Sequence, residues 1–322
     1  MSPVFGKKKG TAGKTVAILD IESGSVGAAL ARISPHEAPK LFAETRISLP
    51  IHKTRDSVAL ARAVEVAAEQ ALLHVSGVAT RMREHEALRH QGEVGRVAVF
   101  MSPPWATMHL AGGTADFAEP VQHMARGVSR SLFGEVPTSF HPLGSAAAHG
   151  NALIFPSDSA NLLCIVGGEV SELLVLNNHT VFGHATVPLG QHALMRTLIS
   201  HGNVSPAEAE SFLRLANREG HVLSEPMRVV EDHVAALVAQ AADEARADKA
   251  LSGVVVLAHE PISGIVARAL SREKNLAQLF PAGGTVRSLR ASHAMPYFTA
   301  HAPRPDVNLM LEALFIDGKF SA

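Results

Sequence analysis

The sequence is poor in cysteine, in large aromatic residues and in net charge. Its 322 residues include one cysteine, one tryptophan and one tyrosine. A lone cysteine, Cys164, excludes an intramolecular disulfide framework and any CxxC metal or redox site. The 29 Lys and Arg residues nearly balance the 30 Asp and Glu residues, which gives a formal net charge of -1. This balance excludes a global electrostatic grip on nucleic acid, so we expect no nucleic-acid partner.

Long apolar runs are also absent from the sequence, since none reaches the ~18–20 residues that span a bilayer. Hydrophobic residues nevertheless make up 47% of the chain and charged residues 18%, so the chain can bury a substantial core. At roughly 100–200 residues per domain, the length suggests two domains. Residues 1–14 contain three consecutive lysines, and we interpret them as a flexible basic tail. We expect a cytoplasmic protein, with any membrane association made through a partner.

The first half of the chain alternates short apolar runs with one clear amphipathic segment. Apolar runs at 15–21, 26–33 and 41–48 predict three strands joined by turns. From Leu60 to Val75, apolar residues recur at spacings of three and four, which predicts a helix. This half is completed by a predicted strand at 97–101, a helix at 121–132 and a weak strand at 138–141.

The second half repeats this order with little sequence identity to the first. Ser205 and Glu208 form a capping box around Pro206, which predicts a helix start. Two successive halves with the order strand, strand, strand, helix, strand, helix indicate a duplicated architecture of mixed sheets covered by helices. The predicted strands of this half lie at 162–166, 171–176, 180–187 and 254–257, and its other helices at 191–200, at 227–249, after 263 and at 306–315.

The turn between the first two strands of each half resembles a phosphate-binding loop of the actin-like ATPase superfamily, which includes actin, hexokinase and the heat-shock chaperones. Residues 16–26 (VAILDIESGSV) resemble the first loop, in which an Asp precedes glycine and hydroxyl residues. Residues 163–173 (LCIVGGEVSEL) resemble the second loop, whose family form is Asp-x-Gly-Gly-x-x-Thr-Asp/Glu. Residues 182–190 and the helix start at 205–210 are most similar to the bacterial branch that contains FtsA and PilM.

This resemblance implies an α/β fold of two actin-like domains, each a ribonuclease H-like half with a mixed sheet flanked by helices. Domain I is expected at 15–155 and domain II at 160–322. The resemblance further implies that the C-terminal helix at 306–315 packs back on domain I.

The resemblance also implies a nucleotide site with ATP and Mg²⁺ as cofactors. Hairpin loops with glycines and hydroxyls aim backbone N–H groups at phosphate oxygens, and carboxylates hold Mg²⁺. Asp20 would be the metal-side carboxylate and the candidate catalytic residue, and Gly264 would lie on the adenosine side. The implied phosphate-binding residues are Ser23, Gly24, Ser25, Gly167, Gly168 and Ser171.

Four positions depart from the family pattern where the chemistry takes place. Ile165 stands at the position of the second-loop Asp, and Glu22 replaces the glycine after the first Asp. The adenosine loop, a Gly-Gly pair in the family, falls on Ala258 and His259. Residues 101–105 (MSPPW) lack the Gln or Glu that positions the attacking water. A retained scaffold with altered chemistry is typical of a degenerate or slow ATPase.

Two functions fit this combination. The first is a scaffold or adaptor of the FtsA or PilM type, in cell division or type IV pilus assembly, with weakened or absent ATP hydrolysis. It would act through a protein partner or self-association, as part of a peripheral membrane complex. The alternative is an active ATPase or small-molecule kinase in which Glu169 or Glu172 replaces the missing Asp. The enzyme needs at least two carboxylates converging on one metal ion, and the scaffold needs none.

The 18 histidines do not predict a metal cluster. His85 and His90 are five positions apart instead of the four of a zincin helix, so they diverge around the helix axis. His109 and His123 show no ligand spacing either. Cys164 lies in an apolar strand, which predicts a buried and inert thiol.

Overall fold

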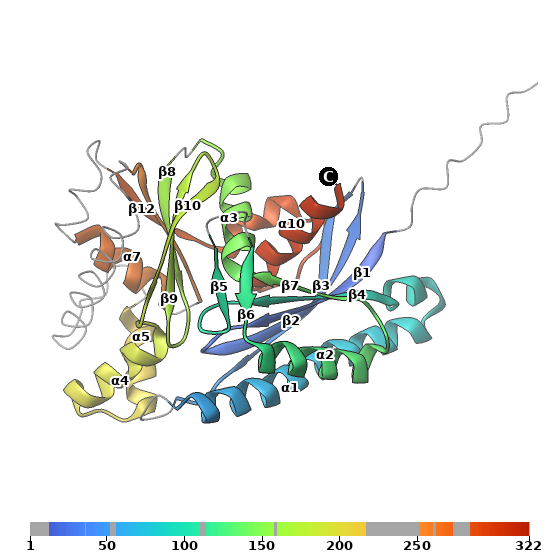
Figure 1. Ribbon diagram of the computed structural model, residues 1–322, viewed down its shortest axis with the longest axis horizontal. Coiled ribbons are helices and arrows are strands. Elements are labelled where there is room, and N and C mark those ends of the chain that lie inside the picture. The colour runs from blue at the N-terminus through green and yellow to red at the C-terminus, as the bar shows by residue number, and fades with distance from the viewer. Residues whose placement is uncertain are drawn as a thin grey trace, which may run out of the picture.

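Two lobes stand side by side in the computed structural model, each built on a five-stranded mixed sheet (Figure 1). The predicted helix at 227–249 lies outside the described residues, as does most of the expected basic tail. The described residues are 13–35, 37–51, 56–109, 114–157, 160–216, 251–259, 262–272 and 284–321.

The first lobe has the strand order β3-β2-β1-β4-β7, in which the first three strands run antiparallel and the last two run parallel to β1. Two helices, α1 (Ser57–Glu84) and α2 (Glu119–Phe133), cover one face of this sheet. Asp56 caps α1 by accepting hydrogen bonds from two backbone N–H groups. The strands are β1 (Lys14–Ile21), β2 (Ser25–Ser34), β3 (Glu37–Ser48), β4 (Val94–Met101) and β7 (Thr138–Pro142).

The second lobe repeats this topology with the order β10-β9-β8-β11-β12, so the predicted duplication of the fold is confirmed. One face of its sheet is covered by α4 (Gln191–Gly202), α5 (Pro206–Ala216) and α7 (Ser263–Arg272). The strands are β8 (Ala160–Val166), β9 (Ser171–Asn177), β10 (Thr180–Val187), β11 (Gly253–Ala258) and β12 (Thr285–Leu289).

Two helices, α3 (Leu143–Ile154) and α10 (Val307–Ser321), lie between the two sheets (Figure 1). A Cβ atom at Gly150 would lie 2.3 Å from Leu311 Cδ2, so the absence of a side chain there lets α3 and α10 approach closely. The C-terminal helix α10 also packs against β1, β2 and β3 of the first lobe. Each sheet is therefore covered on both faces.

Several elements were not predicted because their sequences lack a one-sided apolar pattern. Helix α3 is rich in alanine and glycine, and its buried residues spread over a broad arc that contacts both α10 and the second lobe, so the sequence shows no narrow apolar stripe. Strand β12 carries only two apolar residues. The remaining unpredicted elements are β5 (Ala106–Met108), β6 (Ala115–Phe117), α9 (Ala291–Ala294) and the 3₁₀ helices Glu86–Gln91 and Met295–Tyr297.

Cys164 is fully buried on β8, and burial raises the pKa of its thiol to about 12, as expected for an inert cysteine. No helix within the described ranges combines the length and the apolar character needed to cross a membrane.

Candidate functional site

Asp20 lies near the end of β1, on the face that points toward α10. Side chains alternate along a strand, so Asp20 shares this face with Val16 and Ile18, while Ala17 and Leu19 face the α1 side. The Asp20 side chain is fully buried. The period-two pattern of β1 thus places one carboxylate in the interior, between the sheet and α10.

Arg46 on β3 reaches Asp20 across the intervening strand β2. Asp20 pairs with Gly27 in the β1–β2 register, and Gly27 pairs with Arg46 in the β2–β3 register. A Cβ atom at Gly27 would lie 2.8 Å from Arg46 Nη2 and 3.0 Å from Cζ. Gly27 therefore leaves the space through which the guanidinium crosses β2.

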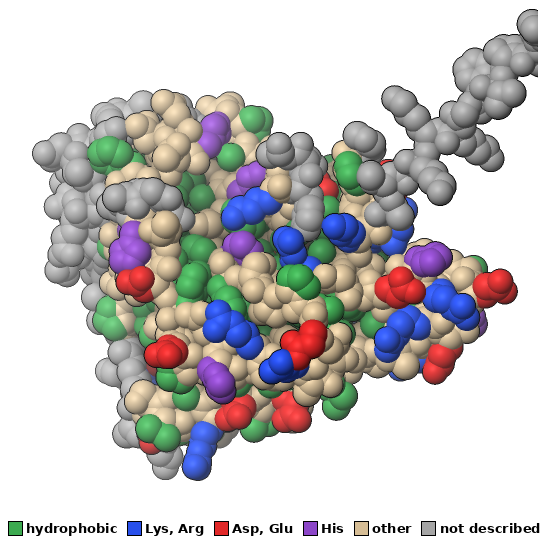
Figure 2. Space-filling model, turned by 45° about the vertical axis from the view of Figure 1, so that its right-hand side comes forward, with side chains coloured by type: hydrophobic (Ala, Val, Ile, Leu, Met, Phe, Trp, Pro, Cys, Tyr) green, Lys and Arg blue, Asp and Glu red, His purple; other side chains and the backbone are tan. Residues whose placement is uncertain are grey.

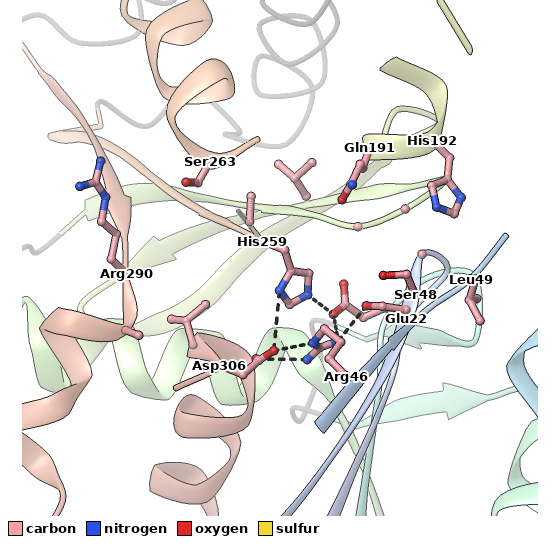
Figure 3. Close-up of a pocket in the computed structure, with 18 of the residues that line it drawn as sticks. Glu22, Arg46, Ser48, Leu49, Gln191, His192, His259, Ser263, Arg290 and Asp306 are labelled. Atoms are coloured by element: carbon pink, nitrogen blue, oxygen red, sulfur yellow. Dashed lines mark hydrogen bonds and ion pairs between the residues drawn. The ribbon is translucent and has the colours of Figure 1, made fainter. Parts of the chain in front are cut away.

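All five N–H donors of the Arg46 guanidinium have acceptors. Nε donates to Asp306 Oδ2 at 2.5 Å, and Nη2 donates to Asp306 Oδ1 at 3.1 Å. Nη2 also donates to Asp20 Oδ2 at 2.5 Å. Nη1 donates to Glu22 Oε1 at 2.9 Å and to Ser25 Oγ at 2.8 Å. The planar fork of arginine suits such bridging, and here it joins β3, the β1–β2 turn and the start of α10 (Figure 3).

Glu22 connects the two lobes. Its Oε1 accepts hydrogen bonds from His259 Nε2 at 2.6 Å and from Asn308 Nδ2 at 3.0 Å. Burial raises the pKa of Glu22, but His259 and Arg46 outweigh burial and lower it. Burial and Arg46 lower the pKa of His259, but Glu22 outweighs them and raises it. Because His259 follows β11, a charged pair spans the interface between the lobes.

The buried cluster holds more acidic than basic side chains. Glu312 lies one turn after Asn308 on α10, and neither of its oxygens has a hydrogen-bond partner among the described residues. Burial raises the pKa of Asp20 to about 7 although Arg46 opposes this. Burial, and next the charge of Asp20, raise the pKa of Glu312 well above its usual range. Glu312 therefore favours its protonated form, and Asp20 titrates near neutrality.

The two glycine loops touch each other. A Cβ atom at Gly168 would lie 2.2 Å from Gly24 Cα and 2.3 Å from its nitrogen. Ser23 Oγ accepts a hydrogen bond from the backbone N–H of Glu169 at 2.9 Å. The close backbone contact leaves no room for a phosphate group between Gly24 and Gly168.

The carbonyl groups of the second loop bind the start of α4. Gly167 O accepts from Gln191 N at 2.9 Å, and Gly168 O accepts from His192 N at 2.8 Å. The first N–H groups of a helix are a common anion-binding feature because they lack partners within the helix. In this protein, two of those donors are already engaged by the chain itself.

The remaining predicted residues lie around this contact. Ser171 Oγ donates to Leu189 O at 2.7 Å and is fully buried. Gly264 is the second residue of α7, after Ser263, which lines the cleft. The nucleotide-binding roles of the predicted residues stay predictions.

The two acidic residues of the second loop, Glu169 and Glu172, form ion pairs with side chains outside the Arg46 cluster. Glu169 accepts two hydrogen bonds from Arg196, at 2.9 and 2.5 Å, and its Oε1 lies 3.2 Å from His192 Nδ1. Glu172 pairs with His184 at 3.0 Å. Neither carboxylate belongs to the cluster around Arg46.

A cavity of about 620 Å³ lies beside the Arg46 cluster, between the lobes (Figure 3). Its volume is within the range of small-molecule sites. Glu22, Arg46 and Asp306 line it from the first lobe and the start of α10. Residues of the second lobe also line this cavity, among them Gln191, His192, His259 and Ser263.

Asp20, Glu22 and His259 could hold a metal ion, because their ligand atoms lie within 4.8 Å of one another. Glu22 thus lies within reach of Asp20, as an enzyme would require. Arg46, however, already donates to both carboxylates. Ile165, at the position of the second-loop Asp, is buried in an apolar cluster. A divalent cation and a guanidinium cannot share the space between these carboxylates, so the residues present do not fit the Mg²⁺–nucleotide site of this fold.

Sequence reasoning missed the residues that organise the site. Arg46 was placed in a predicted strand but was assigned no role. Asp306 was noted only as the first residue of a predicted helix. His259 was interpreted as the loss of a glycine. One signal was available for Arg46, namely a charged residue within a strand of an otherwise apolar meander. It indicates no partner by itself.

Comparison with known proteins rests on structure, because no protein-family model matches the chain and no curated protein matches it significantly. A chain of the PilM-PilN type IV pilus biogenesis complex superposes with a TM-score of 0.60 at 12% identity. That alignment covers 95% of this chain and 98% of the other. By its fold, this chain is therefore a two-domain actin-like protein.

Two other solved structures match with lower TM-scores. The ethanolamine utilization protein EutJ from Carboxydothermus hydrogenoformans gives a TM-score of 0.48 at 16% identity, over 80% of this chain and 82% of its own. A ROK family protein from Streptococcus pneumoniae TIGR4, solved with sucrose, gives 0.49 at 12% identity, over 95% and 99%.

The contact between the glycine loops predicts a sharp difference between two glycine substitutions. Gly168→Ala places a methyl group against the Gly24 backbone, so we expect it to lower the free energy of unfolding by about 1–3 kcal/mol or more. Gly127→Ala is the control, because Gly127 is exposed in α2 with nothing within 4 Å of its Cβ position. It should stabilise the protein by up to about 1 kcal/mol. Urea unfolding measures both, and equal effects would contradict the close contact.

The ion pairs of Glu169 predict an acid-sensitive part of the stability. Burial raises the pKa of Glu169, but hydrogen bonds from Arg196 and His192 outweigh burial and lower it from 4.5 to about 2. The carboxylate therefore stabilises the fold fully above pH ~4.5, and this contribution is lost as the pH falls toward ~2. Glu169→Gln should cost about 1–3 kcal/mol at pH 6 and almost nothing near pH 2. Urea unfolding across this pH range checks it, and a difference independent of pH would contradict the assignment.

Proposed function

We propose that this protein is an actin-like scaffold or adaptor of the PilM type, which acts through a protein partner and does not depend on ATP hydrolysis. The observation that carries the proposal is that Arg46 and His259 bind the carboxylates of Asp20 and Glu22. Arg46 fills the space between the carboxylates of Asp20 and Glu22, so that space is not left for a metal ion. The likeness to a chain of the PilM-PilN complex over nearly the whole length supports the same conclusion.

The proposal of weak or absent hydrolysis is supported by the chemistry that the cleft would need. Hydrolysis of a nucleotide requires a metal ion to neutralise charge and a side chain that orients water. Residues 101–105 carry no carboxylate or amide side chain. Glu169, a candidate replacement for the missing Asp, is already held by Arg196 and His192.

A protein partner is the second part of the proposal. The neighbouring structure is a complex of PilM with PilN. On the face seen in Figure 2, Lys and Arg side chains intermix with Asp and Glu side chains, without a large patch of one sign. This mixed pattern suits the binding of another protein better than the binding of a polyanion or an anionic membrane. Membrane association would then come through the partner.

The alternative of an active ATPase or small-molecule kinase has one observation in its favour. Asp20, Glu22 and His259 lie close enough to hold a metal ion. An active enzyme would have to move Arg46 away from both carboxylates before a cation could bind. That movement would break five hydrogen bonds in the interior, so we favour the scaffold.

The test is co-expression of this chain with the PilN-type protein of its own organism, followed by affinity purification. We expect a stable complex whose yield does not change when ATP and Mg²⁺ are added or removed. Asp20→Ala is the matched control in a parallel assay of ATP hydrolysis, where we expect wild type and variant to show equal rates at the background level. A hydrolysis rate above background that the variant loses would establish the enzyme instead, and the absence of any complex would overturn the adaptor proposal.

A further inference from the structure

We propose that Arg46 is a built-in replacement for the divalent cation of the actin-like cleft. Its guanidinium lies between Asp20 and Glu22, where it supplies the positive charge that a bound metal ion would otherwise supply. This inference goes beyond the scaffold proposal and does not depend on it, because it concerns the charge balance of the cleft and not the partner.

The position of Arg46 is set by the sheet and does not rely on a flexible loop. Asp20, Gly27 and Arg46 occupy one row across β1, β2 and β3. Any side chain at Gly27 would meet the guanidinium, at 2.8 Å from its Nη2. Leu309 of α10 closes the same space, with its Cδ2 3.3 Å from the Gly27 Cβ position. The guanidinium therefore lies between β2 and α10.

The hydrogen bonds of Arg46 favour a structural cation over a residue that binds a substrate. Its five N–H donors are shared among Asp306, Asp20, Glu22 and Ser25. An arginine that recognises phosphate presents its fork to the ligand. Arg46 has no donor left for one, and all three of its charged partners are carboxylates.

The charges around Arg46 show why a cation is needed at this position. Asp20, Glu22 and Asp306 are all buried or nearly so, with Arg46 and His259 as the basic groups among them. Buried carboxylates without compensation are strongly destabilising. Asp20 Oδ1 remains unpartnered among the described residues, and Asp20, Glu22 and His259 bring ligand atoms within 4.8 Å of one another, so the cluster retains ligands for a metal if the guanidinium is removed.

The contact between the loops completes the argument. In a metal–nucleotide site the cation neutralises both the carboxylates and the phosphates. Here Gly24 and Gly168 touch, and no phosphate can lie between them. The positive charge is therefore needed only to compensate the protein's own carboxylates. The guanidinium of Arg46 supplies that charge as part of the chain, so it does not dissociate as a metal ion can.

The experiment is titration with Mn²⁺ alone, followed by calorimetry and by the electron paramagnetic resonance signal of free Mn²⁺. The wild type should bind no Mn²⁺ that depends on Asp20. Arg46→Ala should bind one Mn²⁺ at least about tenfold more tightly than the wild type, and the double variant Arg46→Ala, Asp20→Asn should lose this gain. Arg290→Ala is the control, because Arg290 lines the cavity outside the cluster and its removal should create no site.

Two results would overturn the proposal. One is Mn²⁺ binding by the wild type that Asp20→Asn abolishes, which can be measured whether or not the Arg46 variants fold. The other is a folded Arg46→Ala that gains no Mn²⁺ binding. If Arg46→Ala does not fold, Arg46→Gln keeps much of the volume and removes the charge, and the same gain is expected of it. Failure to capture a PilN-type partner would leave this inference unaffected, so the two proposals fail separately.

Discussion

The arrangement of the cleft depends on the hydrogen bonds that the guanidinium of Arg46 makes with three carboxylates. The guanidinium binds the carboxylate at the end of β1, the carboxylate in the following turn and the carboxylate that precedes α10. Through Glu22, the same network reaches His259 of the second lobe. One charged group thus connects the first sheet, the helix between the sheets and the opposite lobe.

Glycine makes this arrangement sterically feasible at two places. Gly27 gives the guanidinium its path across β2. Gly24 and Gly168 let the backbones of the two loops meet. In both places the glycine allows close approach between parts of this chain, whereas the resemblance of the loops implies an approach of the chain to a phosphate. The sequence motif is the same in the two situations, so the motif alone does not distinguish them.

Hydrophobic patterning was sufficient to predict most strands and helices of the fold. Short apolar runs identified the strands of both five-stranded sheets except the polar β12, and the spacing from Leu60 to Val75 identified α1. The separate short pair β5–β6 was not identified. Helix α3 was not predicted because it is rich in alanine and glycine and its buried arc is too broad to give an amphipathic pattern. The duplicated strand order agreed with the actin-like fold that the resemblance of the two glycine loops implied.

The site could be predicted only in part, for a physical reason. Asp20 was found because its loop resembles a known motif. Its partner Arg46 lies on another strand, and Asp306 lies 260 residues further along the chain from Arg46. Which charges meet is decided by strand register and by the packing of α10, and neither is written in a local pattern. Glu169 likewise looked available for a metal until its pairing with Arg196 on α4 was seen.

The central claim, that a guanidinium permanently holds the cation position, is tested most directly by nitrogen-15 NMR of the arginine side chains at neutral pH. The Arg46 signals are assigned by their loss in Arg46→Lys. The account predicts that the Nε–H and Nη–H protons exchange slowly with water. It also predicts that their signals do not shift when Mg²⁺ and ATP are added in large excess. Signals that shift or broaden on this addition would show that Arg46 leaves its carboxylates to admit a metal–nucleotide complex, which would contradict the account.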